Sequence, residues 1–151
     1  MKKLGFGCLR LPLTDELGGA VNQALFNRMV DRFMEAGFNY FDTAHSYLNG
    51  KSETAIREGL VKRYPRESFL LTDKLTTPLF KTEADIRPLF QEQLEACGVE
   101  YFDYYWLHAL GGGNYEKVQQ TNAFDFIARM KSEGKIKHIG FSFHDDADLL
   151  E

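Results

Sequence analysis

The chain has 151 residues, a formal charge of −4 at pH 7 and a sequence isoelectric point near 5.6. Hydrophobic residues make up 44% and charged residues 26%, which is typical of a globular chain and excludes the disordered and fibrous classes. The acidic balance creates no general attraction to nucleic acid, and no apolar run approaches the roughly 20 residues that span a bilayer. We therefore expect a single domain over residues 1–151 with no nucleic-acid or membrane partner.

The sequence also predicts a cytoplasmic protein without a structural metal. Lys2 and Lys3 are not followed by the apolar stretch of a signal peptide. Cys8 and Cys97 are far apart and form no CxxC motif, so they provide neither a disulfide framework nor a zinc or iron–sulfur site. We expect both thiols to be buried and reduced.

Strand-like and helix-like patterns alternate along the whole chain. In chain order they predict strand 4–11, helix 21–36, strand 38–42, helix 52–62, strand 69–75, helix 82–97, strand 101–108, helix 115–133 and strand 136–143. Ser52 is expected to cap the second helix, and Thr82 with Asp85 resembles a capping box for the third. Residues 145–151 look like the first turn of another helix.

Strict alternation of strands and helices predicts an α/β fold with a parallel sheet and helical crossovers. Two architectures fit this pattern. One is a flavodoxin-like open sheet of five strands, and the other is a (β/α)8 TIM barrel of which only the first five strands and four helices are present. Periodicity alone does not separate them.

In both architectures the functional residues collect at the carboxyl ends of the strands. Four candidates lie there, namely Asp42, Tyr47, Lys74 and His108. A lysine ammonium favours the ionised form of a nearby phenol, a carboxylate holds the ammonium in place, and a histidine can donate to the same substrate oxygen. Together they suit proton transfer to a carbonyl oxygen, with Tyr47 as the acid. Asp73 should face away from Lys74, because adjacent strand residues alternate sides.

Five stretches in this order resemble the aldo/keto reductase family. They are Phe41-Asp42-Thr43-Ala44-x-x-Tyr47, Gly50-x-Ser52-Glu53, Thr72-x-Lys74-Leu75, Asp103-Tyr104-x-x-x-His108 and Gly134-Lys135-Ile136-x-x-Ile139-Gly140-x-Ser142. The resemblance covers the whole chain and favours the (β/α)8 barrel. The runs LGFGCLRLP and GFSFHD look most like a bacterial branch whose longer members carry a C-terminal iron–sulfur segment.

The resemblance implies reduction of an aldehyde or ketone to an alcohol, with NADP(H) as cofactor, NAD(H) as its alternative and a small carbonyl compound as substrate. It implies that Ser142 binds the nicotinamide carboxamide, and that Cys8, Arg10 and Asp42 lie near the cofactor. Phe143 stands where the family usually has Asn, so the resemblance does not extend to that part of the carboxamide contact.

The alternative is a catalytically inactive barrel fragment, or an assembly or binding module that keeps the motifs. A complete barrel needs about 250 residues, so we expect the domain to be incomplete at its C-terminus and the chain alone to have little or no reductase activity. An open sheet exposes the edge of its last strand, which predicts self-association.

Overall fold

The computed structural model describes residues 3–15 and 19–150 of the chain. Its centre is a five-stranded sheet in the order β1-β2-β3-β4-β5, and every pair of neighbouring strands is parallel. This sequential order is wrong for a flavodoxin-like sheet, in which β1 lies between β2 and β3. It is the order of a (β/α)8 barrel, and the sheet is a partial barrel in which β1 and β5 each pair on one side only within the described residues.

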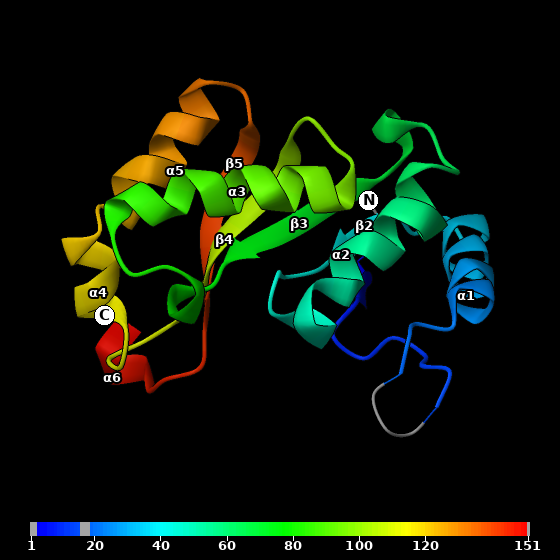
Figure 1. Cartoon of the computed structure of the whole chain (residues 1–151), viewed down its shortest axis with the longest axis horizontal. Coiled ribbons are helices and arrows are strands. Elements are labelled where there is room, and N and C mark those ends of the chain that lie inside the picture. Colours follow the sequence, from blue (N-terminus) through cyan, green and yellow to red (C-terminus); the bar gives the residue numbers. More distant parts are fainter. Residues whose placement is uncertain (1–2, 16–18, 151) are drawn as a thin grey trace.

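Figure 1 shows helices packed along one side of this sheet. The strands are β1 (Gly5–Gly7), β2 (Tyr40–Asp42), β3 (Leu70–Leu75), β4 (Phe102–Leu110) and β5 (Ile136–Phe143). The helices are α1 (Gln23–Glu35), α2 (Lys51–Ile56), α3 (Glu83–Cys97), α4 (Tyr115–Gln120), α5 (Ala123–Ser132) and α6 (Ala147–Leu150). No helix in the described part of the chain is long and apolar enough to cross a membrane.

The predicted helix over residues 115–133 is wrong as a single element, because the structure divides it into α4 and α5. The break lies at Thr121 and Asn122. The Thr121 hydroxyl donates to the carbonyl of Lys117, and Asn122 adopts a left-handed conformation with φ 51°. Threonine and asparagine are poor helix formers, and asparagine tolerates this conformation better than most residues.

The expected cap at Ser52 is also corrected by the structure. Helix α2 begins at Lys51, after Gly50 with φ 81°, and Ser52 lies inside it. The buried Ser52 hydroxyl donates to the Cys8 carbonyl (2.9 Å) and contacts the Thr43 hydroxyl (2.8 Å). It therefore joins α2 to the segments that follow β1 and β2. The capping box at Thr82 is confirmed, because the Asp85 carboxylate accepts from the Thr82 amide (2.8 Å).

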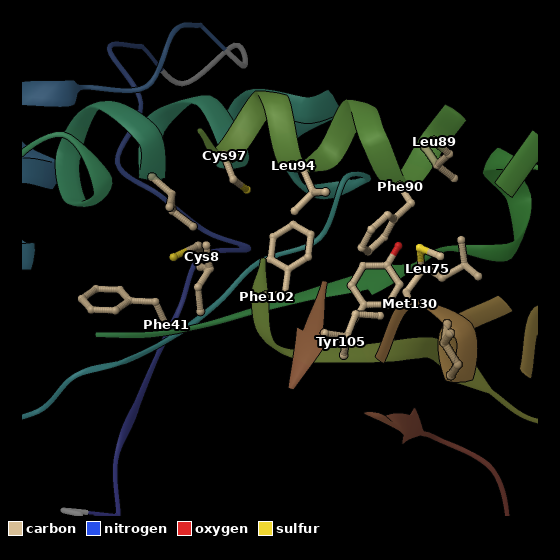
Figure 2. Close-up of a cluster of buried hydrophobic side chains, with 14 of the residues drawn as sticks. Cys8, Phe41, Leu75, Leu89, Phe90, Leu94, Cys97, Phe102, Tyr105 and Met130 are labelled. Carbon is tan, nitrogen blue, oxygen red and sulfur yellow. The ribbon is translucent and has the colours of Figure 1, made fainter. Parts of the chain in front are cut away.

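The hydrophobic core lies between the sheet and its helices (Figure 2). Phe41, Leu75 and Phe102 contribute to it from the strands, and Phe90 and Leu94 contribute from α3. Alternation along each strand sends the intervening side chains to the other face, the interior of the partial barrel. That inner face carries the strand-end residues singled out above.

Candidate active site

Three of the four predicted catalytic residues meet at the carboxyl ends of β2 and β3. Asp42 is the last residue of β2 and pairs in register with Thr72, so Lys74 lies two residues further along β3 on the same face. Tyr47 follows in a short 3-10 turn, Tyr47–Gly50, after β2. Parallel strands and a short connection thus bring a carboxylate, an ammonium and a phenol together.

The Lys74 side chain is only 3% exposed, and its ammonium has all three donors occupied. It donates to Asp42 Oδ1 (2.5 Å), to the Thr43 carbonyl (2.7 Å) and to the Tyr47 hydroxyl oxygen (3.1 Å). Because Lys74 occupies the phenol oxygen as an acceptor, the O–H of Tyr47 is left to donate elsewhere. The Coulomb attraction of the ammonium stabilises the phenolate that forms when that proton is given up.

His108 comes from the end of β4 and lies beside Tyr47, with ring centroids 5.7 Å apart in an edge-on arrangement. Its Nδ1 is 2.7 Å from the hydroxyl of Thr76, which follows the end of β3. Burial, with the charges of Lys74 and His144, lowers the pKa of His108 to about 4. The imidazole is therefore neutral near pH 7 and has one N–H to donate.

The loop that carries Tyr47 is anchored at several points. The carbonyl of Ala44 accepts from the Tyr47 amide (2.9 Å), and His45 Nδ1 lies 2.7 Å from Glu53 Oε2 on α2. Leu48 and Asn49 both have positive φ angles, 52° and 55°, which non-glycine residues adopt at a cost. The loop thus combines local strain with fixed anchors, so the position of Tyr47 depends on contacts made by its neighbours.

The residues expected near the cofactor lie apart from one another. Ser142 is on β5, and its Oγ accepts from the Ala109 amide (2.7 Å), which leaves the hydroxyl proton free to donate. The Cys8 thiol is buried in the core. Arg10 is exposed in the turn after β1.

Two further residues, Thr76 and Trp106, lie in the candidate active site although their sequence positions did not predict it. Thr76 contacts His108. The contact follows from the strand register, because Leu75 pairs with Leu107 and the residues that follow them are Thr76 and His108. Trp106 lies on β4, two residues before His108, in a run of aromatic residues that resembles core packing. Its ring instead lies on the inner face, 5.8 Å from the Lys74 ammonium, as strand alternation from His108 would have shown.

Comparison with known proteins gives a consistent result. The model of the aldo/keto reductase family matches residues 3–151. An NAD(P)H-dependent D-xylose reductase from Candida tenuis is 28% identical over 177 aligned positions, covering 100% of this chain and 51% of the reductase. A probable aldo-keto reductase from Glycine max is 28% identical and covers 94% of this chain and 41% of its own length.

Solved structures support the same fold. The holo form of an aldo-keto reductase from Bacillus halodurans superposes with a TM-score of 0.74 at 27% identity, covering 93% of this chain and 45% of that one. An aldo-keto reductase from Klebsiella pneumoniae in complex with NADPH has a TM-score of 0.75 at 22% identity, covering 97% and 46%. The chain therefore spans about half the length of the proteins it matches.

Proposed function

This chain belongs to the aldo/keto reductase family, whose members are oxidoreductases, and we propose that its strand-end residues support the reduction of an aldehyde or ketone to an alcohol. The observation that carries the proposal is the ammonium of Lys74, buried and bound at once to Asp42 and Tyr47. A lysine held in this way has a specific use, because it stabilises charge on the phenol oxygen as the proton leaves.

Each residue has a distinct role in this proposal. Tyr47 donates its proton to the carbonyl oxygen as that oxygen gains negative charge. Lys74 compensates the charge left on the phenol, and Asp42 keeps the ammonium oriented. The neutral imidazole of His108 donates a hydrogen bond to the same carbonyl oxygen, provided that its proton is on Nε2 and the Thr76 hydroxyl donates to Nδ1.

The donor set fits a nicotinamide cofactor, because these side chains move a proton whereas carbonyl reduction also needs a hydride, which NAD(P)H supplies when bound. We propose NADP(H) as the cofactor, with NAD(H) as the alternative. The free hydroxyl proton of Ser142 would bind the carboxamide, and Asp42 and Arg10 would lie near the cofactor. Cys8 could contribute only through its backbone, because its thiol is buried.

The experiment is to follow NADPH oxidation with a simple aldehyde at a protein concentration close to that of NADPH. Because the chain spans about half the length of its relatives, we expect slow turnover, and the high concentration makes it visible. The rate should fall by about 10²–10⁴-fold in Tyr47→Phe. Tyr115→Phe is the matched control, because Tyr115 is an exposed tyrosine of α4.

A second proposal is that copies of the chain self-associate through the edge of β5. Ile139 and Phe141 on this strand are 42% and 46% exposed, and β5 pairs with β4 alone within the described residues. An open edge with apolar side chains favours pairing with another strand. Light scattering should show dimers or larger species, with fewer in Phe141→Lys, and a stable monomer at high concentration would contradict the proposal.

We also propose a cytoplasmic location, which the two buried free thiols favour.

A further inference from the structure

Two buried carboxyl groups lie directly behind the candidate active site. Asp73 precedes Lys74 on β3, but its side chain points to the opposite face of the sheet, toward α3. Glu53 reaches the same place from α2, and both side chains are 0% exposed. Carboxylate oxygens of the two residues lie within 4.8 Å of each other and of the Cys97 Sγ, which Figure 2 shows extending from α3 toward the sheet.

The hydrogen bonds around this pair are incomplete if both groups are ionised. Asp73 Oδ1 accepts from the Lys74 amide (2.7 Å) and from Gln93 Nε2 (3.0 Å). Glu53 Oε2 is held by His45 Nδ1 (2.7 Å). Glu53 Oε1, however, is buried and has no donor. An ionised carboxylate oxygen without a donor in the interior is costly, and a proton between the two carboxyl groups would remove that cost.

Electrostatics leads to the same arrangement. Two carboxylates this close in a desolvated site cannot both be ionised without strong repulsion. Burial, followed by the charge of Glu53, raises the pKa of Asp73 well above its usual range. Burial raises the pKa of Glu53 to about 7, even though contacts with Asp73 and Gln93 lower it.

We propose that Asp73 and Glu53 share one proton near neutral pH, with Asp73 as the acid that donates to Glu53 Oε1. The pair is a positioning device for the active site. The ionised Glu53 accepts from the Nδ1–H of His45, which lies between Asp42 and Tyr47 in the loop after β2. Asp73 holds the amide of Lys74 from the other side. This positioning role rests on the function proposed above.

The other titratable groups facing the pair are accounted for. Cys97 on α3 and Tyr105 on β4 are buried, and burial raises the pKa of both well above their usual range, so they remain neutral. The Cys8 thiol near Cys97 is kept neutral in the same way. Glu92 on α3 lies beyond His45, 4.0 Å from its Nε2. Lys74 is the nearby cation, but its ammonium is committed to the inner face.

A bound cation is a weaker explanation of the same cluster. The two hydrogen bonds to Asp73 Oδ1 already occupy that oxygen, and the Cys97 Sγ lies 3.7 Å from Oδ2 as a thiol donor. A divalent ion would need the thiolate, which burial disfavours. The shared proton gives Glu53 Oε1 a donor. It does so without displacing a hydrogen bond from Asp73 Oδ1 and without ionising the Cys97 thiol.

The direct test is infrared spectroscopy of the chain in neutral D2O, where a protonated buried carboxylic acid has its own carbonyl band. We expect this band in the unmodified chain, its loss in Asp73→Asn and its shift in Glu53→Gln. Asp103→Asn is the matched control, because Asp103 is also a buried strand aspartate but is paired with Arg66 and Lys137, and the band should remain.

The second readout is the pH dependence of unfolding. The raised pKa of Asp73 means that the folded chain holds one more proton than the unfolded chain over a window that begins near the unfolded carboxyl pKa of about 4 and extends to the raised pKa of Asp73. Stability contributed by the pair is therefore fully present below this window and is lost as pH rises through it. The folding equilibrium constant of the unmodified chain should fall, relative to that of Asp73→Asn, by up to about tenfold per pH unit. Other titrations common to both proteins cancel in this comparison.

The positioning role is tested by NMR over the same range. The resonances of His45 and Tyr47 should shift with the titration of the pair in the unmodified chain, and Asp73→Asn should change the midpoint of that shift, because Glu53 remains buried and then titrates alone. Absence of the acid band, or parallel stability profiles for the unmodified chain and Asp73→Asn, would overturn the shared proton. Stoichiometric Zn²⁺ binding that protects Cys97 from alkylation would overturn it in favour of a cation. None of these measurements uses cofactor or substrate, so they can fail independently of the proposed reductase activity.

Discussion

Replacing Lys74 with methionine tests how much the buried ammonium holds the site together. Methionine retains an unbranched apolar stem of similar length but removes three donors, those to Asp42, the Thr43 carbonyl and Tyr47. Breaking a buried ion pair by removing one partner costs about 3–5 kcal/mol, because the other charge is left uncompensated. The Asp42 side chain keeps 22% exposure to water, so we expect a loss near the lower end, about 3 kcal/mol.

The assay is urea unfolding at neutral pH, with Lys74→Met compared to a double variant that also carries Asp42→Asn. If the stranded carboxylate causes the loss, neutralising it should recover about 1 kcal/mol or more. Lys137→Met is the control. The Lys137 side chain, which pairs with Asp103, is 50% exposed, so we expect this substitution to lower the free energy of unfolding by less than about 1 kcal/mol. A loss no larger than that of the control, or strictly additive effects of the two site changes, would refute the reasoning.

Two further outcomes concern His108. Its pKa of about 4 lies below that of an unfolded histidine near 6.5, so the unfolded chain binds more protons between these values and stability falls as pH drops through this window. His108→Gln should reduce that loss, and a pH profile unchanged by the substitution would contradict the burial argument. Thr76→Val removes the partner of Nδ1, so we expect a changed ring tautomer by nitrogen NMR and an activity loss of up to about tenfold. Thr76→Ser keeps the hydroxyl and should retain both properties.

Much of the fold followed from the alternation of apolar strands with helical repeats. What periodicity could not provide was the order of the strands in space. The choice between the open sheet and the barrel depended on the family resemblance until the sequential order β1-β2-β3-β4-β5 was seen. The helix break at Asn122 was missed because the apolar repeat continues across it, and one left-handed residue leaves no trace in that repeat.

The site was predictable to the extent that it depends on strand ends. Asp42, Lys74 and His108 were placed by counting to the end of each strand, and parallel register brings them to one edge. The Thr76 contact and the buried Glu53–Asp73 pair were not foreseen as parts of this region. Both depend on how side chains from different elements meet, and a carboxylate at position 73 alone does not show that Glu53 of α2 lies against it.

The most direct test of the account is the NADPH-dependent reduction of an aldehyde by the unmodified chain and by Tyr47→Phe, measured at matched high protein concentration. The account predicts slow NADPH oxidation by the unmodified chain and a loss of about 10²–10⁴-fold in Tyr47→Phe, with Tyr115→Phe unchanged. Equal, catalysed rates for the unmodified chain and Tyr47→Phe would contradict the assignment of Tyr47 as the proton donor, whereas an unmodified rate no higher than that of the uncatalysed reaction would favour the inactive barrel fragment.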